Sequence, residues 1–113
     1  MKYTVLKSKI HCVTVTEACL DYEGSIEIDG VLLDKAGIKE FEKVLVANFT
    51  NGNRYETYVT RGKENSGVVK VNGGGARYSC VGDTLTVFSF TVICENATIH
   101  PKIIFVDENN HIK

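Results

Sequence analysis

The sequence predicts a mainly β fold, a small barrel that carries one or two short helices. Apolar residues in several short stretches are rich in β-branched types and partly alternate with polar ones, as in strands that bury one face. Turn-forming pairs and runs that contain glycine separate these stretches, at 51–52, 72–75 and 82–83. Only residues 29–37 carry the capping pattern of a helix.

The first third of the chain predicts two strands and this helix. Residues 2–9 and 11–16 have the composition of strands. The helix has Asp29 as its expected N-cap and Gly37 as its C-terminal stop.

A hairpin is expected next. The apolar run 44–49 predicts a strand, and residues 53–60 predict a strand that returns beside it. Between them lies Asn51-Gly52, a pair that favours a two-residue hairpin turn because both residues accept left-handed backbone angles.

The remainder of the chain continues the β pattern. It is expected to form a polar loop at 61–67, strands at 68–71, 84–93 and 102–107, and a frayed tail at 109–113.

Length and charge limit the possible functions. A chain of 113 residues suffices for one hydrophobic core but not two, so residues 1–113 are expected to form a single domain. The net charge of −1 argues against nucleic acid or an anionic membrane as a partner, because both favour a basic excess. No apolar run approaches the ~18 residues of a membrane span, and no signal-peptide core is expected.

The four cysteines are irregularly spaced and include no C-x-x-C pair. This pattern predicts reduced, partly buried thiols and no metal site or disulfide framework. We therefore expect a cytoplasmic protein.

The pair Gly24-Ser25 has the chemistry of a self-cleaving peptide bond. The Ser25 hydroxyl reaches the Gly24 carbonyl through a five-membered ring, so its attack is intramolecular. Glycine leaves the attacked carbon uncrowded and tolerates strained backbone angles. Elimination from the resulting ester and hydrolysis would turn Ser25 into a pyruvoyl group. The alternative is an ordinary Gly-Ser turn.

Polar side chains on two expected strands have spacings that suit a binding site. Lys9 and His11 lie two residues apart and share a face. Arg54 and Tyr58 also share a face, roughly 13 Å apart on a straight strand, while Thr57 lies on the other. A solvated edge and an ordinary polar sheet face remain the alternatives.

The run Asn72 to Gly75 exposes backbone N–H groups that side chains leave uncovered. Such groups can hold a small anion or a carbonyl oxygen. A simple turn is the alternative.

Taken together and in order, these motifs closely resemble the bacterial aspartate 1-decarboxylases, a family of pyruvoyl enzymes. The resemblance extends from the N-terminus to about Asp107. It rests on Lys9-Ile10-His11, Tyr22 to Ser25, Asn51 to Tyr58, Asn72 to Ala76 and Val81-Gly82-Asp83. It implies a double-psi β-barrel and a homotetramer with active sites between subunits.

The resemblance also implies how the chain matures. Cleavage between Gly24 and Ser25 would give a β-chain of residues 1–24 and an α-chain of residues 25–113, with Ser25 as the pyruvoyl cofactor. Thr57 would help to polarise the Gly24 carbonyl. Whether an activating partner protein is needed stays open.

On the same resemblance, the enzyme would convert L-aspartate to β-alanine and CO2 for pantothenate and coenzyme A synthesis. The aspartate amine would form a Schiff base with the ketone, and Tyr58 would donate the proton after CO2 leaves. The substrate-binding residues would be Lys9, His11, Tyr22, Arg54, Thr57, Asn72, Gly73, Gly74 and Gly75.

Within that set, Lys9 and Arg54 would bind the substrate carboxylates, while His11 and Tyr22 would shape the pocket. Two alternatives stay open. One is a barrel that binds a ligand or partner without catalysis, and the other is a pyruvoyl decarboxylase of another amino acid. The difference between aspartate and glutamate is one methylene, a discrimination of only ~1–3 kcal/mol.

Overall fold

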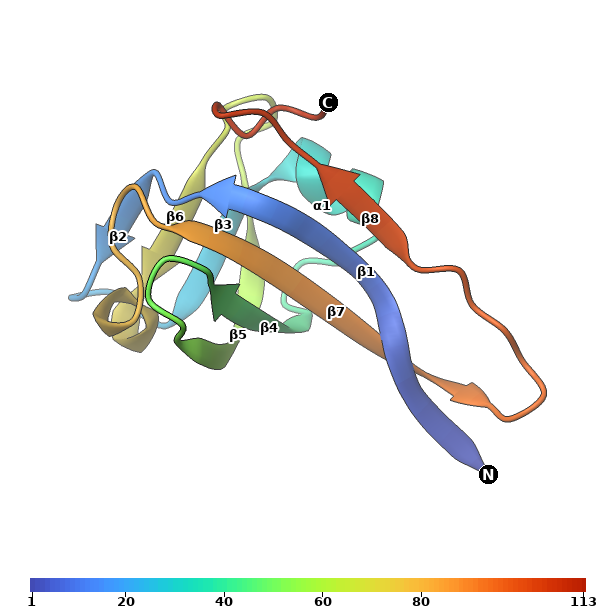
Figure 1. Cartoon of the computed structure of the whole chain (residues 1–113). Helices are drawn as coiled ribbons and strands as arrows, with labels where there is room; N and C mark the ends of the chain where they lie inside the picture. The colour runs from blue at the N-terminus through green and yellow to red at the C-terminus, as the bar shows by residue number, and fades with distance from the viewer.

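Eight strands form one hydrogen-bonded sheet in the computed structural model, which describes residues 1–113 (Figure 1). The strands are β1 (Lys2–Thr14), β2 (Glu17–Cys19), β3 (Ser25–Asp29), β4 (Lys43–Asn48), β5 (Arg54–Gly62), β6 (Val69–Asn72), β7 (Thr84–Cys94) and β8 (Lys102–Phe105). One α-helix, α1 (Gly30–Ala36), follows β3, and a 3₁₀ helix, Gly73–Arg77, follows β6. The mainly β prediction is confirmed.

The strand order is β2-β6-β3-β5-β4-β7-β1-β8, so neighbours in the sheet are often distant in the sequence. Three pairs are parallel, β1 with β8, β2 with β6 and β3 with β5. The long strands β1 and β7 run side by side and extend beyond the rest of the sheet (Figure 1).

The core is built almost entirely from branched aliphatic side chains. Eighteen buried residues form one cluster. The helix contributes to this cluster, and so does every strand except β2. From α1, Leu32, Leu33 and Ala36 face this cluster. The β-branched residues that predicted strands are thus the residues that fill the barrel.

The helix confirms its predicted caps. The Asp29 carboxylate accepts a hydrogen bond from the Val31 N–H, and Gly37 ends the helix with φ at 70°. No helix in the structure is long and apolar enough to cross a membrane.

The two strands expected at 2–9 and 11–16 are one strand, and this prediction was wrong. The β1 ladder to β7 shifts register between Ile10 and Val13, where Cys12 has φ at 56°. The extra residue makes a β-bulge, which bends a strand without ending it. A bulge interrupts the alternation of inward and outward side chains, so the sequence pattern suggests that the strand ends where it only bends.

The prediction of a two-residue turn at Asn51-Gly52 was also wrong. The strands β4 and β5 end at Asn48 and begin at Arg54, and only Gly52 has a left-handed φ, at 82°. The Asn48 side chain takes over the turn, since its Oδ1 accepts from the Thr50 N–H at 2.9 Å. A local Asx turn therefore outcompetes the tighter hairpin.

The tail at 109–113 is tied down and does not fray. Asn110 is 1% exposed, and its side-chain amide bonds both the N–H and the C=O of Thr14 at 2.8 Å. The same amide donates to the Gly67 carbonyl. One asparagine thus fixes the chain terminus to β1 and to the loop before β6.

Three elements had no counterpart among the predictions: β2, β3 and the 3₁₀ helix Gly73–Arg77. Of these, β3 and the 3₁₀ helix flank the candidate site described below.

We predict that Asp29→Ala strongly destabilises the fold. The carboxylate is 1% exposed and accepts from the N–H groups of Val31, Asn65 and Gly67, at 2.9, 3.0 and 2.8 Å. Losing these bonds leaves buried donors unpaired, at a cost of about 3 kcal/mol in the free energy of unfolding. Urea titration measures the loss.

The matched control is Asp34→Ala in the same helix. Asp34 meets Arg61 at the exposed surface, 2.8 Å from its Nη1. Its loss should shift the urea midpoint far less than Asp29→Ala does. Equal shifts would show that the buried hydrogen bonds of Asp29 stabilise the fold no more than the surface ion pair of Asp34 does.

Candidate functional site

The segment that contains Gly24 and Ser25 is anchored at both ends on one residue. Asn72 pairs with Cys19 across the parallel β2–β6 ladder and with Ser25 across the antiparallel β3–β6 ladder. The loop from residue 20 to residue 24 therefore leaves the sheet and returns to it at the same partner.

Asn72 also holds the Ser25 hydroxyl. Its Nδ2 donates to the Ser25 Oγ at 3.1 Å, and the two residues are 2% and 5% exposed. The other side-chain atom, Oδ1 of Asn72, is buried and has no hydrogen-bond partner. Buried polar atoms are nearly always paired, so an orphaned one beside a reactive hydroxyl indicates a functional site.

Glycine is sterically required at position 73. Gly73 has φ at 67°, and a Cβ there would lie 2.8 Å from the Tyr22 carbonyl oxygen and 2.9 Å from the Gly24 Cα. Gly24 itself lies outside the left-handed region, and a Cβ on it would meet open space. The steric demand that was expected at Gly24 therefore falls on the residue packed against it.

A cavity of about 430 Å³ opens beside the Gly24-Ser25 bond. Five of the predicted site residues line it: Gly24, Thr57, Asn72, Gly74 and Gly75. The structure therefore brings together most of the residues assigned to processing. Thr57 shares this cavity with Gly24, but no hydrogen bond joins the two residues.

Four further residues line the cavity and were missed by sequence reasoning: Tyr55, Glu56, Arg77 and Tyr78. The Tyr55 ring stacks on Tyr78 with centroids 5.7 Å apart, and its hydroxyl lies 3.0 Å from the Ser79 Oγ. Burial raises the pKa of the Tyr55 hydroxyl above its usual range. Tyr55 lies two residues before Thr57 on β5 and shares its strand face, and this spacing was the one sequence signal that could have identified Tyr55.

The two basic residues of the prediction lie together elsewhere on the sheet. Lys9 Nζ lies 5.7 Å from the centroid of the Phe88 ring, and Arg54 Cζ lies 5.5 Å from the same centroid. Neither cation forms an ion pair within the chain.

The predicted pocket-shaping residues have separate surroundings. The His11 ring packs edge-on against Phe49 and Phe105, with centroids 5.9 and 5.5 Å away. Tyr22 is 58% exposed, and Lys70 Nζ lies 4.9 Å from its ring centroid.

Tyr58 is also on the surface. It is 38% exposed, and its ring packs against Phe41 with centroids 6.5 Å apart. It does not line the cavity beside Gly24, although Thr57 next to it does. This placement agrees with the prediction that the two residues face opposite ways.

Lys9 and Ser25 lie on strands that are not neighbours in the sheet. Lys9 is on β1 and Ser25 is on β3, with β7, β4 and β5 between them.

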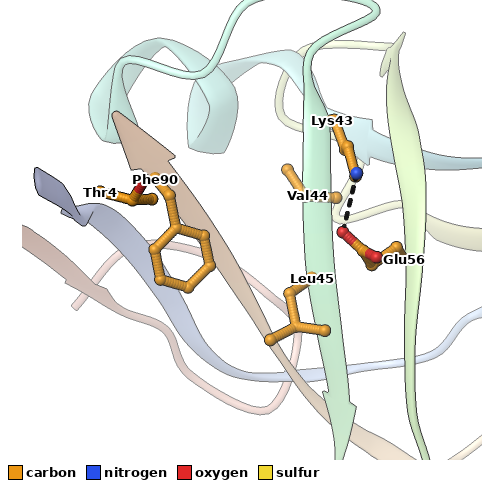
Figure 2. Close-up of a pocket in the computed structure, with 6 residues that line it drawn as sticks. All are labelled: Thr4, Lys43, Val44, Leu45, Glu56 and Phe90. Carbon is orange, nitrogen blue, oxygen red and sulfur yellow. Dashed lines mark ion pairs between the residues drawn. The ribbon is translucent and has the colours of Figure 1, made fainter. Parts of the chain in front are cut away.

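A second cavity, of about 440 Å³, contains none of the predicted site residues (Figure 2). Its lining includes Lys43 and Glu56, which pair with each other at 3.0 Å. Because its charged groups satisfy one another, it is a poorer candidate for binding a charged substrate.

The fold is similar to that of a solved structure, the rationally designed protein mkDPBB_sym_86. The TM-score is 0.51 at 16% identity, over 68% of this chain and 90% of the designed one. This likeness supports the double-psi β-barrel.

Curated relatives match over nearly their whole length, and they are named aspartate 1-decarboxylase. The protein of Clostridium botulinum (strain Loch Maree / Type A3) is 50% identical, over 100% of this chain and 91% of its own. That of Caldicellulosiruptor saccharolyticus is 51% identical, over 99% and 89%. That of Xylella fastidiosa (strain M12) is 48% identical, over 97% and 89%.

A family model described as aspartate decarboxylase matches residues 1–113. The chain belongs to the aspartate decarboxylase family.

Proposed function

We propose that this protein decarboxylates L-aspartate to β-alanine and CO2, using a pyruvoyl group made from its own Ser25. The observation that carries the proposal is the buried Ser25 hydroxyl, which Asn72 holds at the end of an anchored loop. Family membership supports the choice of aspartate as substrate. β-Alanine would then serve pantothenate and coenzyme A synthesis, in the cytoplasm.

The chain would first cut itself. Ser25 Oγ attacks the Gly24 carbonyl carbon, the C–N bond breaks, and an ester forms with a free amine on residue 25. Loss of the Ser25 Cα proton then breaks the bond between Cβ and Oγ of residue 25, which leaves a Gly24 carboxylate and dehydroalanine. Water adds to that residue as ammonia leaves, and the product is a ketone.

Asn72 suits this step. Its Nδ2 donates to Oγ, so the hydroxyl hydrogen stays free to move to a base as the bond forms. The 3.1 Å contact also limits rotation of the Ser25 side chain, which favours a near-attack geometry.

The residues around position 25 also fit the finished group. A ketone there needs a hydrogen-bond donor close by, and the Asn72 amide, which donates to the Ser25 Oγ, could supply it. When formed, the pyruvoyl group supplies an electron-withdrawing carbonyl next to the bond that breaks.

Two groups of side chains would handle the substrate. Lys9 and Arg54 would bind its carboxylates, because neither cation has an acidic partner in the chain. Tyr58 Oη would give a proton to the substrate Cα once CO2 has left. The pocket would also include His11, Tyr22, Thr57 and the backbone of Gly73, Gly74 and Gly75.

A homotetramer with active sites between subunits would unite these groups. The positions of Lys9 and Ser25 on strands that are not sheet neighbours are compatible with this arrangement. An activating partner protein stays a possible requirement for cleavage.

We predict that the purified protein forms β-alanine from L-aspartate and that Ser25→Ala forms none. The variant keeps the fold but has no hydroxyl to attack Gly24. Chromatography of the amino acids measures the product. If neither protein formed a product, a barrel that binds a ligand without catalysis would be favoured. If the wild type decarboxylated only another amino acid, that amino acid and not L-aspartate would be the substrate.

We predict that Gly73→Ala slows cleavage by roughly tenfold to a hundredfold. A methyl group at position 73 must displace the 22–24 backbone, and small misplacements of reacting atoms have effects of this size. Denaturing gel electrophoresis of samples taken after synthesis follows the uncut chain.

The control is Gly74→Ala, where a Cβ meets nothing within 4 Å. It should cleave at the wild-type rate. If both glycine variants cleaved normally, the close contact of Gly73 with the loop would have no part in processing.

Tyr58→Phe should cleave normally but lose roughly 10²- to 10⁴-fold in kcat, because the proton donor is gone. Steady-state kinetics on the cleaved variant measures this. A fully active Tyr58→Phe protein would remove Tyr58 from the mechanism.

A further inference from the structure

We propose that Phe88 is a positioning residue for substrate binding, whose ring holds both Lys9 and Arg54, the two cations assigned to the carboxylates of the substrate. The inference rests on the proposed function, and it adds a residue that no motif in the sequence singled out.

The sheet places Phe88 between the strands that carry the two cations. Phe88 on β7 pairs with Lys9 on β1 and with Leu45 on β4. Paired residues project on the same face of a sheet, so the Lys9 side chain extends along the ring. Its Nζ lies 5.7 Å from the ring centroid.

Arg54 reaches the same ring diagonally. It pairs with Ala47 on β4, and Ala47 pairs with Thr86, two residues before Phe88 on the same face. The small Ala47 side chain leaves room above β4, and Arg54 Cζ comes within 5.5 Å of the Phe88 centroid. Both distances lie inside the ~6 Å range of a cation–π contact.

The ring is itself held in place. Phe88 is half-buried, and it stacks on Phe90 with centroids 6.4 Å apart and ring planes 16° apart. A phenyl ring has only two side-chain torsions, so its position is well defined compared with the long chains that lie on it.

The two cations have no other counter-charge in the chain. Most lysines and arginines of the chain form no ion pair, so the feature that distinguishes Lys9 and Arg54 is that both also lie over one ring. Glu56 shares a strand face with Arg54, but it pairs with Lys43 at 3.0 Å. Two like charges gathered on one ring and left without carboxylates indicate a ligand that brings two carboxylates of its own.

The ring thereby acts on specificity. It fixes the two cationic groups relative to one another, and a dicarboxylate whose acid groups match that spacing meets both without rearrangement. Without the ring, both long side chains would move more freely, and a substrate longer by one methylene would be rejected less well.

The first test is Phe88→Leu in the cleaved enzyme. Its KM for L-aspartate should rise roughly tenfold because two cation–π contacts are lost, while kcat should stay within about twofold. The preference for L-aspartate over L-glutamate in kcat/KM should fall. Phe88→Tyr keeps the ring and should stay near wild type in both constants.

The matched control is Tyr3→Leu, which removes an exposed ring from β1 that stacks on no other ring and lies under no cation. It should leave KM near the wild-type value. A rise in KM as large as that of Phe88→Leu would overturn the proposal, as would an unchanged KM in Phe88→Leu or a tenfold rise in Phe88→Tyr.

Calorimetric titration with succinate tests the inference without turnover. Wild-type protein should bind this dicarboxylate, and Phe88→Leu should bind it roughly tenfold more weakly. No succinate binding by the wild type, or equal affinities, would overturn the role of Phe88. A protein that binds succinate in this way but forms no β-alanine would contradict the proposed function and leave the role of Phe88 supported.

Discussion

One contact between two backbone segments determines the geometry of the whole candidate site. The loop from 20 to 24 begins and ends beside Asn72, and Gly73 packs so closely against that loop that no side chain fits between them. Strand β6 therefore acts as a template for the bond between Gly24 and Ser25. The 3₁₀ helix that follows it supplies the wall of the adjoining cavity, through Gly74 and Gly75.

The barrel divides the proposed chemistry between two regions. Strands β3, β5 and β6 carry the residues that would make the ketone, and β1, β5 and β7 carry the cations and the ring that would hold the substrate. Strand β5 belongs to both, with Thr57 beside the cleavage site and Arg54 over Phe88. If one small domain serves both maturation and turnover, it needs such a shared strand, or contacts between copies, to join the two.

Much of the secondary structure could be predicted from the sequence, because it depends on residues close to one another in the chain. The helix caps Asp29 and Gly37 and the β-branched strands were all visible. The long-range interactions were not. The bulge at Cys12 depends on pairing with β7, and the ordered tail depends on Asn110 reaching Thr14. Phe88 gave no motif at all, since its contacts come from two other strands.

The central claim is that the chain cuts itself before Ser25, and the masses of the freshly purified protein under denaturing conditions test it most directly. The account predicts two species, residues 1–24 and residues 25–113, with the larger one lighter by the mass of ammonia than a chain that begins with serine. A single species at the mass of the intact 113-residue chain, unchanged after prolonged warming, would contradict self-cleavage.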